Sequence, residues 1–186
     1  MKVTETNING LLILEQDIYH DERGWFSESY NEKLFNKILN RYNQSEVNFV
    51  QDNHALSHKH VLRGLHYQQK PYTQAKLLQV LQGSIWDVAV DLREDSATYK
   101  KWIGIELSAK NKKQLWIPAG FAHGYLSLED NSFVTYKTTR FYKKSKELCI
   151  KWNDSELKIN WPINPDVSII LSPKDKIAQS LKDLVL

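Results

Sequence analysis

The sequence predicts a mainly β fold, a sandwich or a barrel of short antiparallel strands. One reason is a series of β-branched and aromatic segments that follow one another with short gaps after Tyr42. A second reason is the turn signals between these segments. Gln82-Gly83 predicts a tight turn, and residues 110–113 and 129–131 predict polar hairpin tips. Many short strands at this spacing are typical of antiparallel sandwiches and barrels.

The chain is predicted to begin with a hairpin or a pair of edge strands. Residues 3–6 and 11–15 are β-prone, and Asn7-Ile8-Asn9-Gly10 between them has the composition of a turn. Residues 21–24 form a charged segment that is predicted to be a loop.

One amphipathic helix is predicted at residues 30–41. Ser29 and Glu32 have the spacing of a capping box, in which each side chain bonds the backbone N–H of the other residue. The apolar residues that follow recur at helical spacing, namely Leu34, Phe35, Ile38 and Leu39.

The remaining strands are predicted at residues 47–51, 61–68, 76–82, 84–91, 102–107, 114–117, 123–128 and 133–138. Along the strand 84–91, Val88 and Val90 share one face. The other face carries Asp87 and Asp91, an acid pair that indicates either a wet interior or an exposed side.

A short C-terminal helix is predicted near residue 173. Ser172 is its expected N-cap and Pro173 fits the first turn. Its apolar positions are expected to be Ile177, Leu181 and Leu184.

Length and composition indicate one domain over residues 1–186. The 41% hydrophobic content suffices for one core and is small for two. The net charge of +3 lacks a clustered basic stripe, so no nucleic-acid partner is expected. The apolar run 11–14 is too short for a signal peptide, and no apolar stretch is long enough to span a membrane. Cys149 is the single cysteine, which predicts neither disulfides nor a cysteine zinc site and favours a reducing cytoplasm.

Three histidines form a candidate metal site. His58 and His60 would point to one side of an extended segment, and His123 ends a Pro-x-Gly-x-x-His turn of the kind seen in cupins. Such a set could hold a divalent metal inside a jelly roll. However, metal-binding cupins usually place a glutamate shortly after the His-x-His pair, and residues 61–65 contain none. Metal binding is therefore disfavoured.

His66 is a candidate general base, although by itself it could be a structural histidine. Arg63 precedes it by three residues, which on a regular strand places it on the opposite face, and Lys76 should lie on the adjacent strand. Nearby positive charge lowers the pKa of a histidine, which favours a neutral base at pH 7. Local sequence alone gives no catalytic role to Tyr136, an ordinary aromatic, or to Asp175, a helix-capping acid.

Taken together, these motifs resemble the dTDP-4-dehydrorhamnose 3,5-epimerase family over nearly the whole chain. The matching segments are residues 21–24 (Asp-Glu-Arg-Gly), 49–53, 61–68, 87–93, 115–124, 136–139 (Tyr-Lys-Thr-Thr), 152–154 and 161–162. The resemblance implies a metal-free, cupin-like jelly-roll barrel that binds a dTDP-linked sugar and no cofactor. It also implies a homodimer that exchanges N-terminal β structure.

The resemblance assigns roles to individual residues. It makes His66 the general base and Asp175 the carboxylate that orients its ring. Tyr136 matches the general acid on the opposite face of the sugar, and Lys76 matches the lysine at the 4-keto oxygen. His123 either touches the sugar or supports the barrel wall. The implied nucleotide contacts are Gln51, Asn53 and Arg63, together with Arg23, Phe26 and Glu28, which the partner chain would supply.

The implied activity is the inversion of C3 and C5 of dTDP-4-dehydro-6-deoxyglucose through an enolate, giving dTDP-4-dehydrorhamnose for surface polysaccharides. Inversion of C3 alone, as in some relatives, is an alternative that would use the same residues. A metal-dependent cupin enzyme and a non-catalytic carbohydrate-binding module are further alternatives. The module would have no need of the four catalytic residues.

Overall fold

The structure is a computed structural model that describes residues 1–185. Along the chain its elements are β1 (Lys2–Glu5), β2 (Leu12–Glu15), β3 (Tyr19–Asp21), β4 (Gly24–Phe26), α1 (Glu32–Arg41), β5 (Gln51–Ser57), β6 (Leu62–Gln68), β7 (Lys76–Gln82), β8 (Ser84–Asp91), β9 (Trp102–Ser108), β10 (Lys113–Ile117), β11 (Phe121–Ser127), β12 (Ser132–Thr138), β13 (Glu147–Cys149) and α2 (Pro173–Lys176). Among these residues, no helix is long and apolar enough to cross a membrane.

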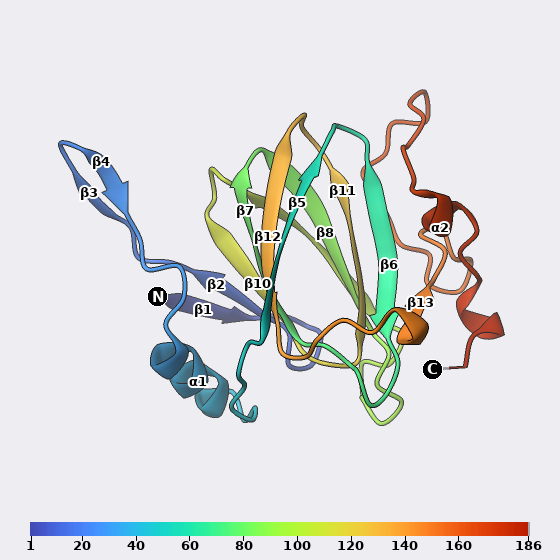
Figure 1. Cartoon of the computed structure of the whole chain (residues 1–186), viewed down its shortest axis with the longest axis horizontal. Helices are drawn as coiled ribbons and strands as arrows, with labels where there is room; N and C mark the ends of the chain where they lie inside the picture. Colours follow the sequence, from blue (N-terminus) through green and yellow to red (C-terminus); the bar gives the residue numbers. More distant parts are fainter. Residues whose placement is uncertain (186) are drawn as a thin grey trace.

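Two antiparallel sheets face each other and form the body of the molecule (Figure 1). The first sheet has the strand order β1-β2-β10-β7-β12-β5, and the second has the order β13-β6-β11-β8-β9. A separate hairpin, β3-β4, projects away from both sheets at the upper left of Figure 1. The predicted mainly β, cupin-like barrel is confirmed, whereas the extent of one domain over residues 1–186 stays a prediction.

Apolar side chains fill three layers. The inner core lies between the sheets and includes Leu78 of β7 and Ala89 of β8. The outer face of the second sheet is covered by the C-terminal part of the chain, which contributes Trp161. The outer face of the first sheet is covered by α1 through Phe35 and Leu39. Because both outer faces are covered by apolar packing, the space between the sheets can open at one place without exposing the whole core.

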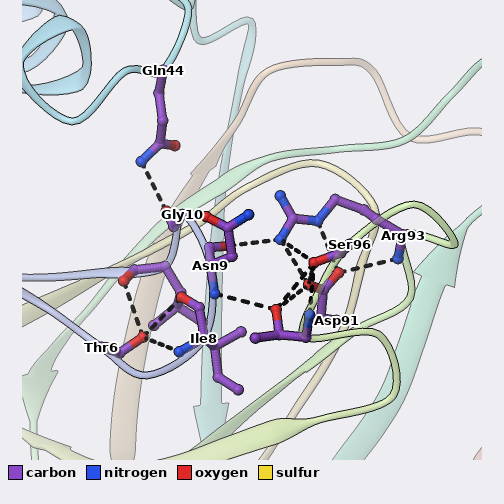
Figure 2. A network of polar contacts seen from close by, with 10 residues as sticks. Thr6, Ile8, Asn9, Gly10, Gln44, Asp91, Arg93 and Ser96 are labelled. Carbon is purple, nitrogen blue, oxygen red and sulfur yellow. Dashed lines mark hydrogen bonds and ion pairs between the residues drawn. The ribbon is translucent and has the colours of Figure 1, made fainter.

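A polar network joins the N-terminal turn to the connection between β8 and β9 (Figure 2). The buried Asp91 carboxylate accepts hydrogen bonds from Arg93 Nε at 2.8 Å and from Thr98 Oγ1 at 2.7 Å. Arg93 Nη2 also donates to the Asn9 carbonyl at 2.6 Å, and Gln44 Nε2 donates to the Gly10 carbonyl at 2.9 Å. Burial opposes ionisation of Asp91, but the hydrogen bonds from Arg93, Ser96 and Thr98 outweigh it, and the pKa of Asp91 lies below the usual range. The network therefore anchors the β1-β2 turn to the sheet opposite.

Two predicted starts of elements are wrong. The N-cap of α1 is Asn31, whose side chain accepts from the Leu34 N–H at 3.0 Å, and the predicted capping box from Ser29 does not form. Asparagine caps a helix as well as serine does, and the Ser29 carbonyl is already bonded by Gln114. The backbone of Val47 is hydrogen-bonded to the side chain of Asn36 in α1 and does not join a sheet. Of the predicted strand 47–51, only Gln51 is in a strand, as the first residue of β5.

The polar strands were the ones that the sequence did not predict. β5 alternates half-buried and exposed residues, and β3, β4 and β13 are short. The C-terminal helix is confirmed with Ser172 as its N-cap, but α2 ends at Lys176. Ile177 is 81% exposed, so this expected apolar position is wrong, whereas Leu181 and Leu184 pack against the C-terminal layer beyond the end of the helix.

An irregularity in β6 changes the direction of its side chains. His66 pairs with His123, yet Arg63 pairs with Tyr125, so three steps along β6 match two along β11. The extra residue makes Arg63 and His66 face the same side, and the predicted opposite faces are wrong. Gly64 lies here at φ +115°, and a Cβ on it would lie 2.7 Å from the Gly124 Cα. Glycine at this crossing allows the two backbones to approach.

We expect Gly64→Ala to lower the free energy of unfolding strongly, because a disfavoured backbone conformation and overpacking each cost about 1–3 kcal/mol. Gly24→Ala is the matched control, since Gly24 has φ +124° but nothing within 4 Å of the added Cβ. Denaturant unfolding of both variants measures the difference. Equal losses of stability would show that the crossing imposes no packing constraint.

Candidate active site

A cavity of about 400 Å³ lies between the two sheets. Strands β5, β7 and β12 of the first sheet and β6 and β11 of the second contribute side chains to it, and α2 closes one side. Eight of the residues predicted from the sequence line it, namely His66, Lys76, Tyr136, Asp175, Gln51, Asn53, Arg63 and His123. The structure thus brings the expected catalytic set into one place.

His66 and Asp175 form a tight pair although 109 residues separate them in sequence. His66 Nε2 lies 2.7 Å from Asp175 Oδ1, and Ser172 Oγ donates to Oδ2 of the same carboxylate at 2.7 Å. Burial opposes ionisation of Asp175, but the hydrogen bonds from His66 and Ser172 prevail and its pKa is lowered. An ionised carboxylate only accepts hydrogen bonds, so Nε2 carries the hydrogen and Nδ1 carries the lone pair. His66 is therefore arranged as a proton acceptor.

Lys76 approaches from the first sheet, because β7 pairs with β10 and β12. The predicted position on the strand adjacent to His66 is wrong, since a crossover connects β6 to β7 across the barrel. Its ammonium lies 3.4 Å from His123 Nδ1 and 5.9 Å from the centre of the Tyr136 ring. Burial lowers the pKa of Lys76 to about 8, and Asp87 partly opposes this shift. The Lys76 ammonium therefore loses its proton only slightly above neutral pH.

His123 and Asp87 form a second histidine–carboxylate pair, with Nε2 and Oδ2 2.8 Å apart. Both side chains are buried, so the acid face of β8 turns inward, as one of its two interpretations predicted. Burial and the neighbouring Lys76 lower the pKa of His123, and Asp87 opposes them. A neutral ring that donates from Nε2 accepts at Nδ1, where Lys76 stands. The pair therefore positions the lysine.

Tyr136 lies on β12, in the sheet opposite His66. Burial raises the pKa of its phenol, so the group stays protonated at neutral pH and can donate a proton. A ligand between the sheets would thus have an acceptor on one side and a donor on the other.

Polar groups at the edge of the cavity are available to a ligand. Arg63 is fixed by Ser57 Oγ and by the Leu56 carbonyl, each at 3.1 Å. Gln51 Nε2 donates to Asn53 Oδ1 at 2.8 Å on the half-buried face of β5. These three residues, predicted to contact the nucleotide, lie along the border between β5 and β6.

Sequence reasoning did not find several residues at the cavity. Gln68 Oε1 accepts from the Lys143 N–H at 2.9 Å, which leaves its amide nitrogen pointing elsewhere without a partner among residues 1–185. Its position two residues after His66 on the same strand face could have revealed it. Lys174 binds Glu147 at 2.8 Å, and no local pattern indicated that pair. The alternation of residues along β8 indicated Asp87, but no local pattern indicated its pairing with His123.

The structure does not bring the candidate metal-binding histidines together. His58 has a side chain that is 76% exposed and lies 4.0 Å from Asp130, whereas His123 is buried in the cavity. Arg23, Phe26 and Glu28 do not line the cavity either. Arg23 binds Asp21 within the β3-β4 hairpin, and Phe26 is 68% exposed. The hairpin residues thus lie outside the cavity of their own chain.

This chain is similar in sequence and in structure to known sugar-nucleotide epimerases. A family model described as dTDP-4-dehydrorhamnose 3,5-epimerase matches residues 5–183. The dTDP-4-dehydrorhamnose 3,5-epimerase of Shigella flexneri is 49% identical over 98% of this chain and 97% of its own length. The crystal structure of the dTDP-6-deoxy-D-glucose-3,5-epimerase of Legionella pneumophila, in complex with dTDP-4-keto-L-rhamnose, has a TM-score of 0.91 at 44% identity and covers 97% of this chain and 93% of that one. A 3'-monoepimerase of Streptomyces bikiniensis, in complex with dTDP-quinovose, has a TM-score of 0.86 at 30% identity and covers 95% and 86%.

The charge arrangement predicts that Asp87→Asn lowers the pKa of Lys76 below its value of about 8, because Asp87 favours the ammonium. Heteronuclear NMR of labelled lysine can follow this titration. Glu156→Gln removes a carboxylate that binds the distant Lys100 and should leave the pKa of Lys76 unchanged. An unchanged or raised pKa in Asp87→Asn would contradict the arrangement.

Proposed function

This chain belongs to the dTDP-4-dehydrorhamnose 3,5-epimerase family, and we propose that His66, Lys76 and Tyr136 carry out its reaction without a metal or other cofactor. It is an isomerase that inverts C3 and C5 of dTDP-4-dehydro-6-deoxyglucose to give dTDP-4-dehydrorhamnose. The observation that carries the proposal is the His66–Asp175 pair facing Lys76 and Tyr136 across one cavity. The monoepimerase, at 30% identity, is more distant than the 3,5-epimerases at 49% and 44%.

The first step is proton abstraction by His66. The 4-keto group acidifies the C–H bonds at C3 and C5, so removal of either proton gives an enolate. Nδ1 of His66 takes this proton, while Asp175 holds the Nε2 hydrogen and stabilises the imidazolium that forms. Positioned acid–base groups of this kind contribute about 10²–10⁴-fold to a rate.

The enolate is stabilised by Lys76. Negative charge develops on the keto oxygen, and a preorganised cation stabilises this charge more than solvent would. His123 and Asp87 keep the ammonium in place, since His123 Nδ1 faces it at 3.4 Å. At neutral pH Lys76 is still largely charged, because its pKa of about 8 lies above the pH.

Inversion requires a new proton on the opposite face of the carbon. Tyr136 stands in the sheet opposite His66 and is kept protonated by its raised pKa. It donates this proton to the enolate, which changes the configuration at that carbon. After this step His66 releases its proton to solvent and the Tyr136 phenolate takes one up, so the same pair of groups can serve C3 and C5 in turn when the sugar rotates in the cavity.

The nucleotide part of the substrate binds along β5 and β6. Arg63 supplies positive charge for the diphosphate, and Gln51 and Asn53 supply amide groups for the remaining polar atoms. Their common position at the cavity border supports these roles. The expected role in surface polysaccharide synthesis and the cytoplasmic location inferred from the lone Cys149 stay predictions.

The functional unit is a homodimer in which two copies exchange their β3-β4 hairpins. In the single chain this hairpin exposes Tyr19, Trp25 and Phe26 by 61%, 56% and 68%. Large aromatic side chains exposed together are typical of an interface. The exchanged hairpin and the segment directly after it would deliver Arg23, Phe26 and Glu28 to the nucleotide in the cavity of the other copy.

We expect His66→Asn to lower turnover by at least about 10²-fold, because the general base is removed. The fold should remain intact, since the asparagine side chain is polar like that of histidine and is smaller. The reaction in heavy water, followed by NMR, measures both the rate and the positions of deuterium. Wild-type protein should label C3 and C5, and label at C3 alone would contradict double epimerisation. Turnover of His66→Asn at the wild-type rate would contradict its role as base.

The exchanged hairpin predicts complementation between two impaired variants. In a dimer of one His66→Asn chain and one Arg23→Ala chain, one cavity would receive an intact His66 and an intact Arg23. Random pairing of equal amounts should therefore restore about a quarter of wild-type activity, as expected for a two-fold dimer. The control is each variant assayed separately after the same unfolding and refolding. Activity no greater than the mean of the two variants would show that Arg23 does not act in the partner's cavity.

A further inference from the structure

Cys149 lies directly opposite His66 in the second sheet. The two residues are partners in the antiparallel pair of β6 and β13. The neighbouring residues Leu65 and Ile150 exchange both backbone hydrogen bonds, at 3.1 and 2.9 Å. His66 and Cys149 therefore form the next, non-hydrogen-bonded pair, in which opposite side chains share a face and approach most closely. The catalytic pairing of His66 with Asp175 does not use this thiol.

Nitrogen, sulfur and oxygen ligands meet at this point. One ligand atom from each of His66, Cys149 and Asp175 lies within 4.8 Å of the other two. A tetrahedral zinc ion with bonds of about 2.0–2.3 Å needs ligand atoms roughly 3.3–3.8 Å apart, so small side-chain rotations suffice. Asp175 is already held by Ser172 Oγ at 2.7 Å, which restricts one ligand before any ion arrives. Three protein ligands leave the fourth position for water.

We propose that His66, Cys149 and Asp175 form a binding site for Zn²⁺ or a similar thiophilic divalent cation, and that its occupation inhibits the enzyme. The inhibition rests on the proposed role of His66 as base, whereas the binding does not. Imidazole and thiolate ligands select zinc-like ions over Mg²⁺ and Ca²⁺. The proposed site therefore includes the catalytic base of a reaction that we propose to use no metal.

The inhibition follows from the protons that binding displaces. In the free enzyme Nε2 of His66 carries hydrogen toward Asp175, and Nδ1 carries the lone pair that accepts the substrate proton. A cation bound to Nε2 takes the lone pair of that nitrogen, so the ring hydrogen moves to Nδ1. The thiol proton of Cys149 passes to solvent. With hydrogen on Nδ1, the ring no longer accepts a proton from C3 or C5.

Spectroscopy with Co²⁺ tests the site in the absence of substrate. Wild-type protein titrated with Co²⁺ should develop the intense near-ultraviolet absorption that marks a thiolate–cobalt bond. Cys149→Ala and His66→Asn should each abolish it, and circular dichroism would establish that both variants are folded. Bound Co²⁺ without this absorption in the wild type, or an unchanged absorption in Cys149→Ala, would overturn the proposal.

Inhibition by Zn²⁺ provides the second measurement. Wild-type activity should fall on addition of Zn²⁺ and recover with a chelator. Cys149→Ala should keep the basal activity but need far more Zn²⁺, beyond the roughly 10–100-fold that loss of an outer-shell partner costs. Equal inhibition of both proteins would refute the site while leaving the catalytic role of His66 intact. Conversely, full activity of His66→Asn would refute the role of His66 as base. The cobalt spectrum of the wild-type protein would still test the metal site.

Discussion

The close crossing of β6 and β11 at Gly64 and Gly124 is the constraint on which the site depends. A Cβ on Gly124 would lie 2.6 Å from the Arg63 carbonyl, so only glycine fits this contact. The crossing accompanies the extra residue in β6, which brings Arg63 and His66 to the same face. Leu62 and Leu65 then both face the C-terminal layer, outside the cavity. Without the irregularity, the arginine or the histidine would point into that apolar layer.

The two histidine–carboxylate pairs have different functions because their Nδ1 atoms face different surroundings. His123 is 6% exposed and its Nδ1 faces the Lys76 ammonium at 3.4 Å, so this nitrogen is not available to a substrate. His66 pairs with Asp175 in the same way, but its side chain is 24% exposed toward the cavity. The pairing with a carboxylate fixes the tautomer in both cases. What faces the other nitrogen decides which histidine is the base and which one holds the cation.

The sequence predicts the apolar strands well and the strands that border the polar cavity poorly. The reason is that the prediction depends on a pattern of apolar residues. Strands such as β7 and β8 bury apolar side chains on one or both faces. Their apolar composition therefore identifies them as strands. One face of β5 borders a polar cavity, so its residues alternate without an apolar signal. The pairing of His66 with Asp175 spans 109 residues and has no local signature, so only the family resemblance indicated it. The placement of Lys76 in the opposite sheet depends on a crossover that no pattern of residues encodes.

Buried polar atoms show that part of the interior is built for a ligand rather than for stability. Three side-chain atoms are buried and have no hydrogen-bond partner among residues 1–185, namely Gln68 Nε2, Asp87 Oδ1 and Trp86 Nε1. A buried polar group without a partner costs about 1–3 kcal/mol, and apolar residues at these positions would avoid that cost. Gln68 lines the polar cavity and Asp87 stands behind His123, whereas Trp86 packs against the C-terminal layer. Gln68 lines the cavity, so an acceptor oxygen of a substrate can bind its amide nitrogen. The cavity is thus the place where this fold exchanges stability for binding.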